Sequence, residues 1–168
     1  MATTPDLSGR ILGQYQIIER IGEGGMAAVY RARQINLDRE VALKTLPDKL
    51  AQNPQYEERF EREAKAVASL QHPHIVPIFD SRTDHGISYI TMRLLTGGSL
   101  GDRMANREKQ GADLPSLSEI AQLLKQVGSA LDYAHGRGVI HRDIKPSNIM
   151  FDDQGNPFIV DFGIAKVL

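Results

Sequence analysis

The chain has 168 residues, of which 41% are hydrophobic and 24% are charged, and its formal net charge is −1. This composition is that of an average soluble globular protein with enough apolar material for a core. The nearly neutral charge excludes a global basic field that would hold nucleic acid or an anionic membrane. The absence of cysteine excludes disulfides and thiolate chemistry. Neither a membrane span nor a signal peptide is recognisable, so we expect a cytoplasmic protein.

Residues 1–12 are predicted to be a short disordered leader. Strand-like runs follow at residues 15–21, 29–33 and 41–46, and the turn signals between them predict three antiparallel strands. A glycine-rich stretch, GEGGMAA, separates the first two runs.

A helix is predicted to begin at Asn53, which is a typical N-cap, with Pro54 at the first helical position. Positions 56, 60, 63, 67 and 70 then fall on one helical face. All are apolar except Glu63. An unpaired carboxylate on a buried stripe is expensive, so Glu63 either pairs with a cation or lies at the edge of the stripe and reaches water.

Two more strands, a joint, a loop and a second helix are predicted next. Residues 72–80 and 87–95 are predicted to be two more strands, and the TGGSL stretch after them is predicted to be a flexible joint. Residues 105–116 are predicted to be a polar loop. A capping-box spacing at Ser116 predicts the start of an amphipathic helix, which ends at the glycines of HGRG.

Residues 148–160 are predicted to be a hairpin with its turn at DDQGN. Strands with one helix, a joint, a long helix and a hairpin indicate an α+β protein with two lobes. We place the first lobe at residues 13–95 and the second at residues 96–168.

The glycine-rich stretch carries Gly22, Gly24 and Gly25 between two predicted strands. Glycine lets the backbone turn sharply and approach a phosphate closely. An ordinary hairpin loop explains the same residues equally well. The stretch is not a dinucleotide fingerprint, because a strand rather than a helix follows it, and no Gly-Lys-Ser/Thr of a Walker A loop is present.

Lys44 lies in the predicted strand VALKTL, on the same face as Ala42 and Leu46. If this face packs on the helix, Lys44 is a partly buried cation that needs an anionic partner, and Glu63 is the candidate. If the face is open to water, Lys44 is an ordinary surface lysine.

The stretch HRDIKPSN concentrates polar side chains in a loop, because its proline prevents a regular helix. Asp143 can accept a proton from a hydroxyl group, and Lys145 can neutralise a transferring phosphoryl group. Asn148 can supply an oxygen ligand to a metal ion. Asp161 of the DFG stretch is a second oxygen donor, and two such donors suit Mg²⁺. The histidines of the chain are interpreted as structural or exposed.

A glycine loop, VALK, HRDIKPSN and DFG occur in this order, and the chain therefore resembles the N-terminal part of a protein kinase, from about Tyr15 to Leu168. Lys145 followed by Pro146 resembles the serine/threonine class, and GEGGMAAVY and HPHIV resemble its bacterial members. The resemblance implies the bilobal kinase fold. It also implies transfer of a phosphoryl group from ATP to serine or threonine hydroxyls of a protein substrate.

The resemblance implies roles for the catalytic candidates. Lys44 would hold the α- and β-phosphates of ATP and pair with Glu63. Asp143 would be the catalytic base, and Lys145 would assist at the γ-phosphate.

The resemblance also implies the contacts of the nucleotide and the metal. Asn148 and Asp161 would hold Mg²⁺. The nucleotide would be contacted by the glycine loop, an apolar pocket with its gatekeeper, the hinge and a ribose-contacting position. These residues are Ile21, Gly22, Gly24, Gly25, Val29, Ala42, Lys44, Met92, Arg93, Leu95, Ser99 and Met150.

The sequence departs from the family pattern in three ways. Ala27 replaces the third loop glycine and Arg93 stands where an acid is frequent, and both changes are mild. The third departure is length, because the elements that follow DFG in a whole kinase domain hold the peptide substrate and pack on the helix predicted from Ser116. We therefore expect that helix to expose an apolar stripe, and we expect these 168 residues alone to bind Mg-ATP weakly at best and not to phosphorylate protein. The alternatives are a nucleotide-binding module without turnover and a non-functional fragment.

Overall fold

The structure is a computed structural model, and it describes residues 6–24, 27–46, 58, 62 and 64–162. Its contacts divide the chain into two units. The first unit holds the described residues up to 68 together with Pro77–Leu94, and the second holds Ser69–Val76 together with residues 95–162. The α+β class expected from the sequence is confirmed.

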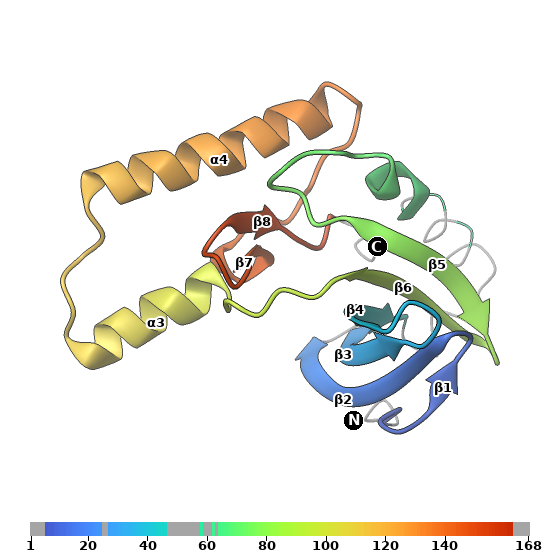
Figure 1. Cartoon of the computed structure of the whole chain (residues 1–168). Coiled ribbons are helices and arrows are strands. Elements are labelled where there is room, and N and C mark those ends of the chain that lie inside the picture. Colours follow the sequence, from blue (N-terminus) through green and yellow to red (C-terminus); the bar gives the residue numbers. More distant parts are fainter. Residues whose placement is uncertain (1–5, 25–26, 47–57, 59–61, 63, 163–168) are drawn as a thin grey trace. The chain divides into compact units, whose positions relative to one another are not determined.

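The first unit is a curled antiparallel sheet of six strands in the order β1-β2-β3-β4-β6-β5 (Figure 1). The strands are β1 (Ile11–Leu12), β2 (Tyr15–Gly24), β3 (Ala27–Gln34), β4 (Arg39–Thr45), β5 (Ile78–Asp84) and β6 (Ile87–Arg93). The three antiparallel strands predicted from the first part of the sequence are therefore confirmed, with small differences at their ends.

Alternation along the strands builds the core of this unit. In β3 nearly every second side chain is buried, and Tyr30 of β3 and Leu43 of β4 are both fully buried on one face. The rings of Tyr15 and Tyr89 meet edge to face in the same core, with their centroids 5.9 Å apart. Because successive side chains of a strand point to opposite faces, Lys44 lies on the face opposite to Leu43.

The structure differs from the expected leader, because residues 6–12 have defined structure. Leu7 and Leu12 are buried in the core of the first unit, and the Gly9 N–H donates to the Ile17 carbonyl at 2.9 Å. The sequence did not reveal this segment because two isolated leucines in a polar stretch produce no helical or strand period.

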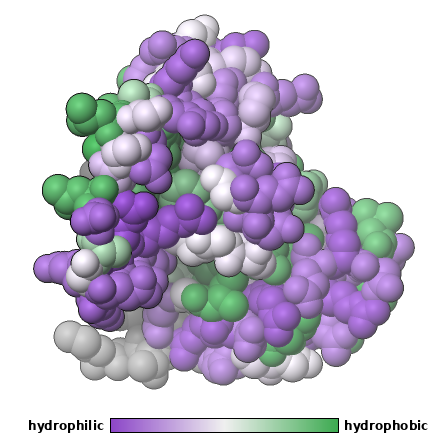
Figure 2. Space-filling model, turned by 60° about the vertical axis from the view of Figure 1, so that its left-hand side comes forward, coloured by the Kyte–Doolittle hydropathy of each residue, from purple (hydrophilic) through white to green (hydrophobic). Residues whose placement is uncertain are grey.

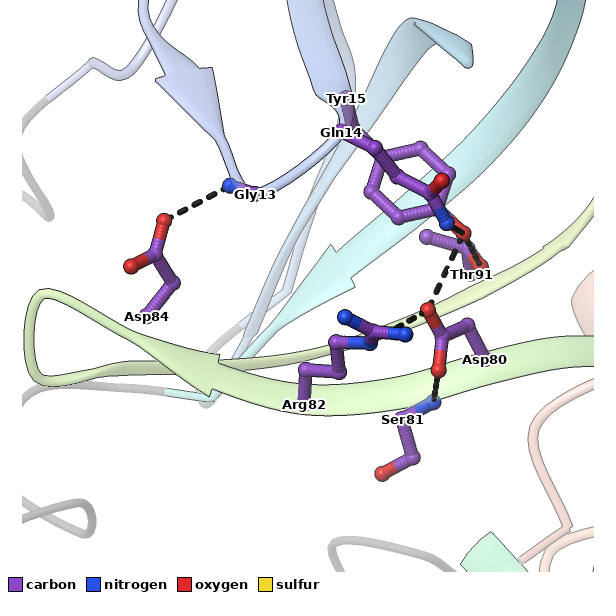
Figure 3. Close-up of polar contacts among 8 residues, drawn as sticks. All are labelled: Gly13, Gln14, Tyr15, Asp80, Ser81, Arg82, Asp84 and Thr91. Atoms are coloured by element: carbon purple, nitrogen blue, oxygen red, sulfur yellow. Dashed lines mark hydrogen bonds and ion pairs between the residues drawn. The ribbon is translucent and has the colours of Figure 1, made fainter. Parts of the chain in front are cut away.

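A network of polar contacts ties the turn between β1 and β2 to the rest of the sheet (Figure 3). The Tyr15 hydroxyl donates to Asp80 Oδ2 at 3.3 Å and accepts from the Thr91 hydroxyl at 3.2 Å. At the tip of β5, the carboxylate of Asp84 accepts the Gly13 N–H at 2.7 Å. This backbone hydrogen bond holds the pKa of Asp84 below its usual value.

The second unit contains α3 (Leu100–Gln110), α4 (Leu117–His135), the 3₁₀ turn η1 (Pro146–Asn148), β7 (Ile149–Phe151) and β8 (Pro157–Ile159). β7 and β8 form the predicted hairpin, with α3 against β7 and α4 against β8 (Figure 1). Both helices begin with a capping box, at Ser99 and at Ser116. The helix predicted to begin after Ser116 is confirmed.

Two secondary-structure predictions for this part of the chain are wrong. Residues 105–110 belong to α3 and not to a polar loop. No residue of α3 is buried, so no apolar stripe marks this helix in the sequence. Residues 72–77 are not a strand, since β5 begins at Ile78 and Ile75 makes only an isolated β-bridge to Ile159.

The apolar stripe of α4 is buried along only one part of the helix. Val127, Ala130 and Ala134 are buried, whereas Leu117 is 86% exposed and Leu124 is 66% exposed. On the face drawn in Figure 2, hydrophobic side chains reach the surface at several places among hydrophilic ones. The expectation that this helix exposes an apolar stripe is confirmed for its N-terminal half.

Candidate functional site

The polar loop of the second unit brings three candidate catalytic residues together. Lys145 Nζ lies 3.1 Å from Asp143 Oδ2. Asn148 Nδ2 donates to the same carboxylate oxygen at 3.2 Å and to the Asp143 carbonyl at 2.9 Å. This proximity arises because Pro146 begins η1, whose tight turn returns the chain toward Asp143. The carboxylate of Asp143 is therefore held in place by a cation and an amide.

His141 joins this loop to the end of the hairpin. Its side chain is 1% exposed, and its Nε2 lies 2.8 Å from the Val160 carbonyl oxygen. Its Nδ1 accepts the Asp143 N–H at 3.2 Å. The Val160 N–H in turn donates to the Asn148 carbonyl at 3.0 Å. The interpretation of His141 as a structural residue agrees with these contacts.

Asp161 follows Val160 in an unusual backbone conformation. Its φ is 59°, in the left-handed region that few non-glycine residues adopt, and Arg142 in the loop has a φ of 63°. Such conformations cluster at functional sites. The ring of Phe162 is 3% exposed and its centroid lies 4.7 Å from that of His141. No role was predicted for Phe162 from the sequence. Its buried ring nevertheless holds the chain on one side of Asp161, and the backbone contacts of Val160 hold it on the other side.

Asn148 and Asp161 are the candidate cation ligands. The buried Asn148 uses its Nδ2 to hold Asp143. The atom of this side chain that would bind a metal ion is therefore its amide oxygen. Carboxamide and carboxylate oxygens suit Mg²⁺, which takes its remaining ligands from water and phosphate. Within the described residues, no group of three or more His, Cys, Asp and Glu forms a metal site of its own.

The sheet of the first unit places four nucleotide-contact candidates on one face. Val29 of β3 pairs with Lys44 of β4, and Ala42 of β4 pairs with Met92 of β6. Ala42 and Lys44 are two residues apart on one strand, so all four side chains share a face. Ala42 and Met92 are both 7% exposed, and Lys44 is half-buried. The side chain of Lys44 is thus not fully open to water, and its role stays a prediction.

The described residues of the glycine loop belong to the paired ends of β2 and β3. Gly22 of β2 pairs with Val29, and Gly24 pairs with Ala27, which leaves only positions 25 and 26 between the paired ends. A Cβ at Gly22 would meet the Val29 Cβ at 3.6 Å, which is an ordinary contact. Packing therefore does not require glycine at position 22. Ile21, before the loop, is 48% exposed.

The hinge and ribose candidates follow β6. Arg93 ends β6, and Leu95 is 7% exposed. Ser99 is 8% exposed and forms a β-bridge with Met150. Its hydroxyl donates to Asp102 at 2.6 Å and accepts the Asp102 N–H at 3.1 Å, so it is engaged in the cap of α3. The same hydroxyl lowers the pKa of Asp102, an exposed carboxylate that sequence reasoning did not select although the Ser-x-x-Asp spacing marks it.

The structure thus assembles two separate groups of predicted residues, one in each unit. Glu63 and Gly25 lie outside the described residues. The pairing of Lys44 with Glu63 therefore stays a prediction. Of the helix predicted around Glu63, residues 64–68 are helical, and Val67 and Leu70 are buried as the predicted face requires.

Comparison with known proteins agrees with this geometry. The family model described as protein kinase domain matches residues 15–168. Serine/threonine-protein kinase PrkC of Bacillus subtilis is 43% identical over 159 residues, which cover 95% of this chain and 24% of the relative. Serine/threonine-protein kinase PknE of Mycobacterium tuberculosis is 39% identical, over 98% of this chain and 28% of its own length. The chain thus spans about a quarter of the length of these relatives.

Solved structures give the same result. The crystal structure of the Mycobacterium tuberculosis PknI kinase domain superposes with a TM-score of 0.80 at 33% identity, over 95% of this chain and 63% of that domain. The curled antiparallel sheet and the loop that gathers an aspartate, a lysine and an asparagine agree with the protein kinase fold of that structure. The chain belongs to the protein kinase family, and its similar relatives are bacterial serine/threonine kinases.

Among the helices that the structure describes, none is both long enough and apolar enough to cross a bilayer.

Proposed function

We propose that this chain supplies the nucleotide-binding part and the catalytic loop of a serine/threonine protein kinase. The observation that carries the proposal is the arrangement of Asp143, Lys145 and Asn148, in which the carboxylate is held by a cation at 3.1 Å and an amide at 3.2 Å. Phosphoryl transfer requires little covalent chemistry from a protein, and positioning with charge stabilisation provides most of the catalysis.

Each residue of the loop has a defined task in this proposal. Asp143 accepts the proton of the acceptor hydroxyl, and the contact with Asn148 fixes the direction of its carboxylate. Lys145 neutralises negative charge on the phosphoryl group as it moves between oxygens. Asn148 and Asp161 hold Mg²⁺ through their side-chain oxygens. The cation supplies charge neutralisation on the phosphates when it is bound.

The residues on the sheet of the first unit bind the nucleotide in this proposal. Lys44 holds the α- and β-phosphates, while Val29, Ala42 and Met92 offer an apolar surface to the adenine ring. Gly22 and Gly24 leave the backbone of the hairpin turn open to the phosphates. The acceptor is a protein serine or threonine, and we place the reaction in the cytoplasm.

Thermal unfolding with and without Mg-ATP tests the nucleotide site. A ligand that binds only the folded state raises apparent stability by about 2.7 kcal/mol at a hundred times its dissociation constant. We expect Mg-ATP to raise the unfolding temperature of the 168-residue chain. Lys44→Ala and Asp161→Asn should abolish the rise, whereas Lys109→Ala, at an exposed position of α3, should retain it. An equal rise in all variants would contradict the assignment.

Phosphate transfer to a generic serine/threonine substrate separates a kinase from a binding module. If the parent chain transfers phosphate, Asp143→Asn should keep the Mg-ATP shift and lower the transfer rate by about a hundredfold or more, because a general base is lost. Nucleotide binding with no transfer by the parent chain would favour the nucleotide-binding module. Neither binding nor transfer would favour a fragment without independent function.

A further inference from the structure

His72 is held in the second unit by contacts on both of its ring nitrogens. The His74 N–H donates to His72 Nδ1 at 3.1 Å, and His72 Nε2 lies 3.5 Å from the Ser129 hydroxyl on α4. The Ser129 hydroxyl itself donates to the Gln126 carbonyl at 2.8 Å, so it receives a hydrogen from Nε2. The ring centroid of His72 also lies 5.3 Å from that of Tyr133 on the same helix.

These contacts fix the protonation state of His72. Because a backbone N–H points at Nδ1, that nitrogen must be an acceptor without a proton. The ring is therefore neutral, with its hydrogen on Nε2. A second proton could be added only at Nδ1, where it would oppose the His74 N–H and break that hydrogen bond.

His74 differs from His72 in this respect. Its Nδ1 lies 2.9 Å from the Pro157 carbonyl, which can only accept, so Nδ1 carries a hydrogen. Protonation of His74 would add a hydrogen at Nε2 and leave this contact intact. Of the two neighbouring histidines, His72 alone loses a hydrogen bond when it is protonated.

The segment that His72 organises connects α4 to the hairpin of the second unit. The Gln71 N–H donates to the Tyr133 hydroxyl at 3.1 Å, which attaches the segment to α4. The Ile159 N–H donates to the His74 carbonyl at 2.8 Å, and the Val76 N–H donates to the Ile159 carbonyl at 3.1 Å. Residues 69–76 thus extend the β7–β8 hairpin. The last strand of this hairpin, β8, ends two residues before Asp161, a candidate metal ligand.

We propose that His72 is an acid-sensitive latch within residues 69–76, which in its neutral form accepts the His74 N–H and on protonation loses this hydrogen bond, so that the segment loosens at residue 74. The proposal is independent of catalysis. It predicts a change in the second unit within the ordinary titration range of histidine.

The groups around His72 favour the neutral form. They are His74 on its own segment and Ser129 and Tyr133 on α4. The nearest cation that the contacts place on this part of α4 is the Arg137 guanidinium, which lies 3.7 Å over the Tyr133 ring and not against His72 itself. Among the described residues, no carboxylate contacts His72. Burial and, to a smaller extent, the charge of His74 lower the pKa of His72 below 6.5. The unfolded chain therefore binds the proton first, and stability falls as the pH drops below the unfolded value.

Histidine side-chain NMR on the whole chain tests the latch between about pH 7.5 and about pH 5. We expect His72 to carry its hydrogen on Nε2 at the upper limit and to titrate below 6.5, the value of an unperturbed histidine. Protonation should weaken the hydrogen-exchange protection of the His74 amide by about fivefold, as expected for one lost hydrogen bond.

A substitution at position 72 distinguishes the proposed role of His72 from a general loss of stability at low pH. In His72→Asn the carboxamide oxygen can replace Nδ1 as the acceptor and cannot be protonated, so the protection of the residue 74 amide should become independent of pH. His85→Asn, at a side chain that is 74% exposed, is the matched control and should leave the pH response unchanged. Titration of His72 at or above 6.5 with an unchanged His74 amide in the parent chain would overturn the proposal even if the variant failed to fold. A response that persists in a folded His72→Asn would overturn it as well.

Discussion

Two buried tyrosines of the first unit differ in the use of their hydroxyl groups. The Tyr15 hydroxyl is bonded to Asp80 and Thr91, and Thr91 is itself fully buried. The Tyr89 hydroxyl is buried without a hydrogen-bond partner among the described residues. Burial raises the pKa of Tyr89 to about 12, so this group stays neutral at any physiological pH. The two tyrosines are therefore equally buried, but among the described residues only the Tyr15 hydroxyl makes hydrogen bonds that can stabilise the fold.

Removal of each hydroxyl should reveal this difference. Tyr15→Phe leaves the Thr91 hydroxyl without its acceptor in a dry core, and we expect a loss of about 1–3 kcal/mol in the free energy of unfolding. Tyr89→Phe removes an unsatisfied polar atom and should be neutral or stabilising. Urea unfolding of both variants measures the difference. Equal losses would show that the Tyr89 oxygen has a partner such as a buried water.

The catalytic candidates were identifiable from the sequence because they are adjacent in it. Asp143, Lys145 and Asn148 lie within six consecutive positions, so a local turn is sufficient to bring them together. The anchoring role of Phe162 depends on a contact with His141, which is distant in the chain, and a single sequence contains no signal for it. The engaged hydroxyl of Ser99 is different, because the local Ser-x-x-Asp spacing marks it although no cap was predicted there.

At the scale of elements, the connection into α3 is shaped by close approach of two backbones. Gly97 donates its N–H to the Phe151 carbonyl at 2.8 Å. A Cβ at this position would collide with the carbonyl oxygens of Phe151 and Asp152. Backbone atoms cannot move aside as a flexible side chain can, so glycine is required here for packing. Gly128 in α4 has no atom within 4 Å of an added Cβ.

Alanine substitutions at these two glycines should therefore have opposite effects. Gly97→Ala should destabilise the chain by about 1–3 kcal/mol, because it overpacks the contact with β7. Gly128→Ala should stabilise it by about 0.5–1 kcal/mol, because alanine loses less conformational entropy in a helix. Thermal unfolding compares the two variants with the parent chain. A stable Gly97→Ala variant would mean that the approach to β7 is looser than described.

The helices also show which elements a sequence can reveal. α4 was predicted correctly because it has both a capping box and a periodic apolar face. α3 has an equally complete capping box but no buried residue, and the glycines before Ser99 suggested a joint instead. Periodicity identifies a helix that buries one face, while a helix that buries none depends on its caps and propensity alone.

At the scale of the whole molecule, the N-terminal half of α4 presents apolar side chains to water. Leu117 is 86% exposed and Leu124 is 66% exposed, and Leu114, just before the helix, is 90% exposed. Exposed apolar side chains that form larger patches promote association of soluble proteins. The concentration at which the chain remains monomeric should therefore depend on these side chains.

Polar substitution of this surface tests that expectation. Leu117→Gln combined with Leu124→Gln should reduce association while changing the free energy of unfolding by less than about 0.5 kcal/mol, since both side chains are exposed. Met104→Gln, at an apolar position of α3 that is 58% exposed, is the control and should have little effect. Sedimentation velocity over a range of concentrations measures the outcome. Unchanged association in the double variant would assign it to another surface.

Residues 69–76 belong to the second unit although residues 77–94 of the first unit follow them in the chain, so a single cut in the gene cannot separate the two units. Residues 95–162 do not form that unit alone, because the Ile159 N–H and carbonyl both pair with backbone groups of this earlier segment. A polypeptide that starts at residue 95 would leave that strand with an open edge, which is a template for pairing with other chains. Split reporters, domain swaps and chimaeras that are divided at residue 95 should therefore keep residues 69–76 with the second half. The segment can be attached to it by circular permutation or supplied as a co-expressed peptide.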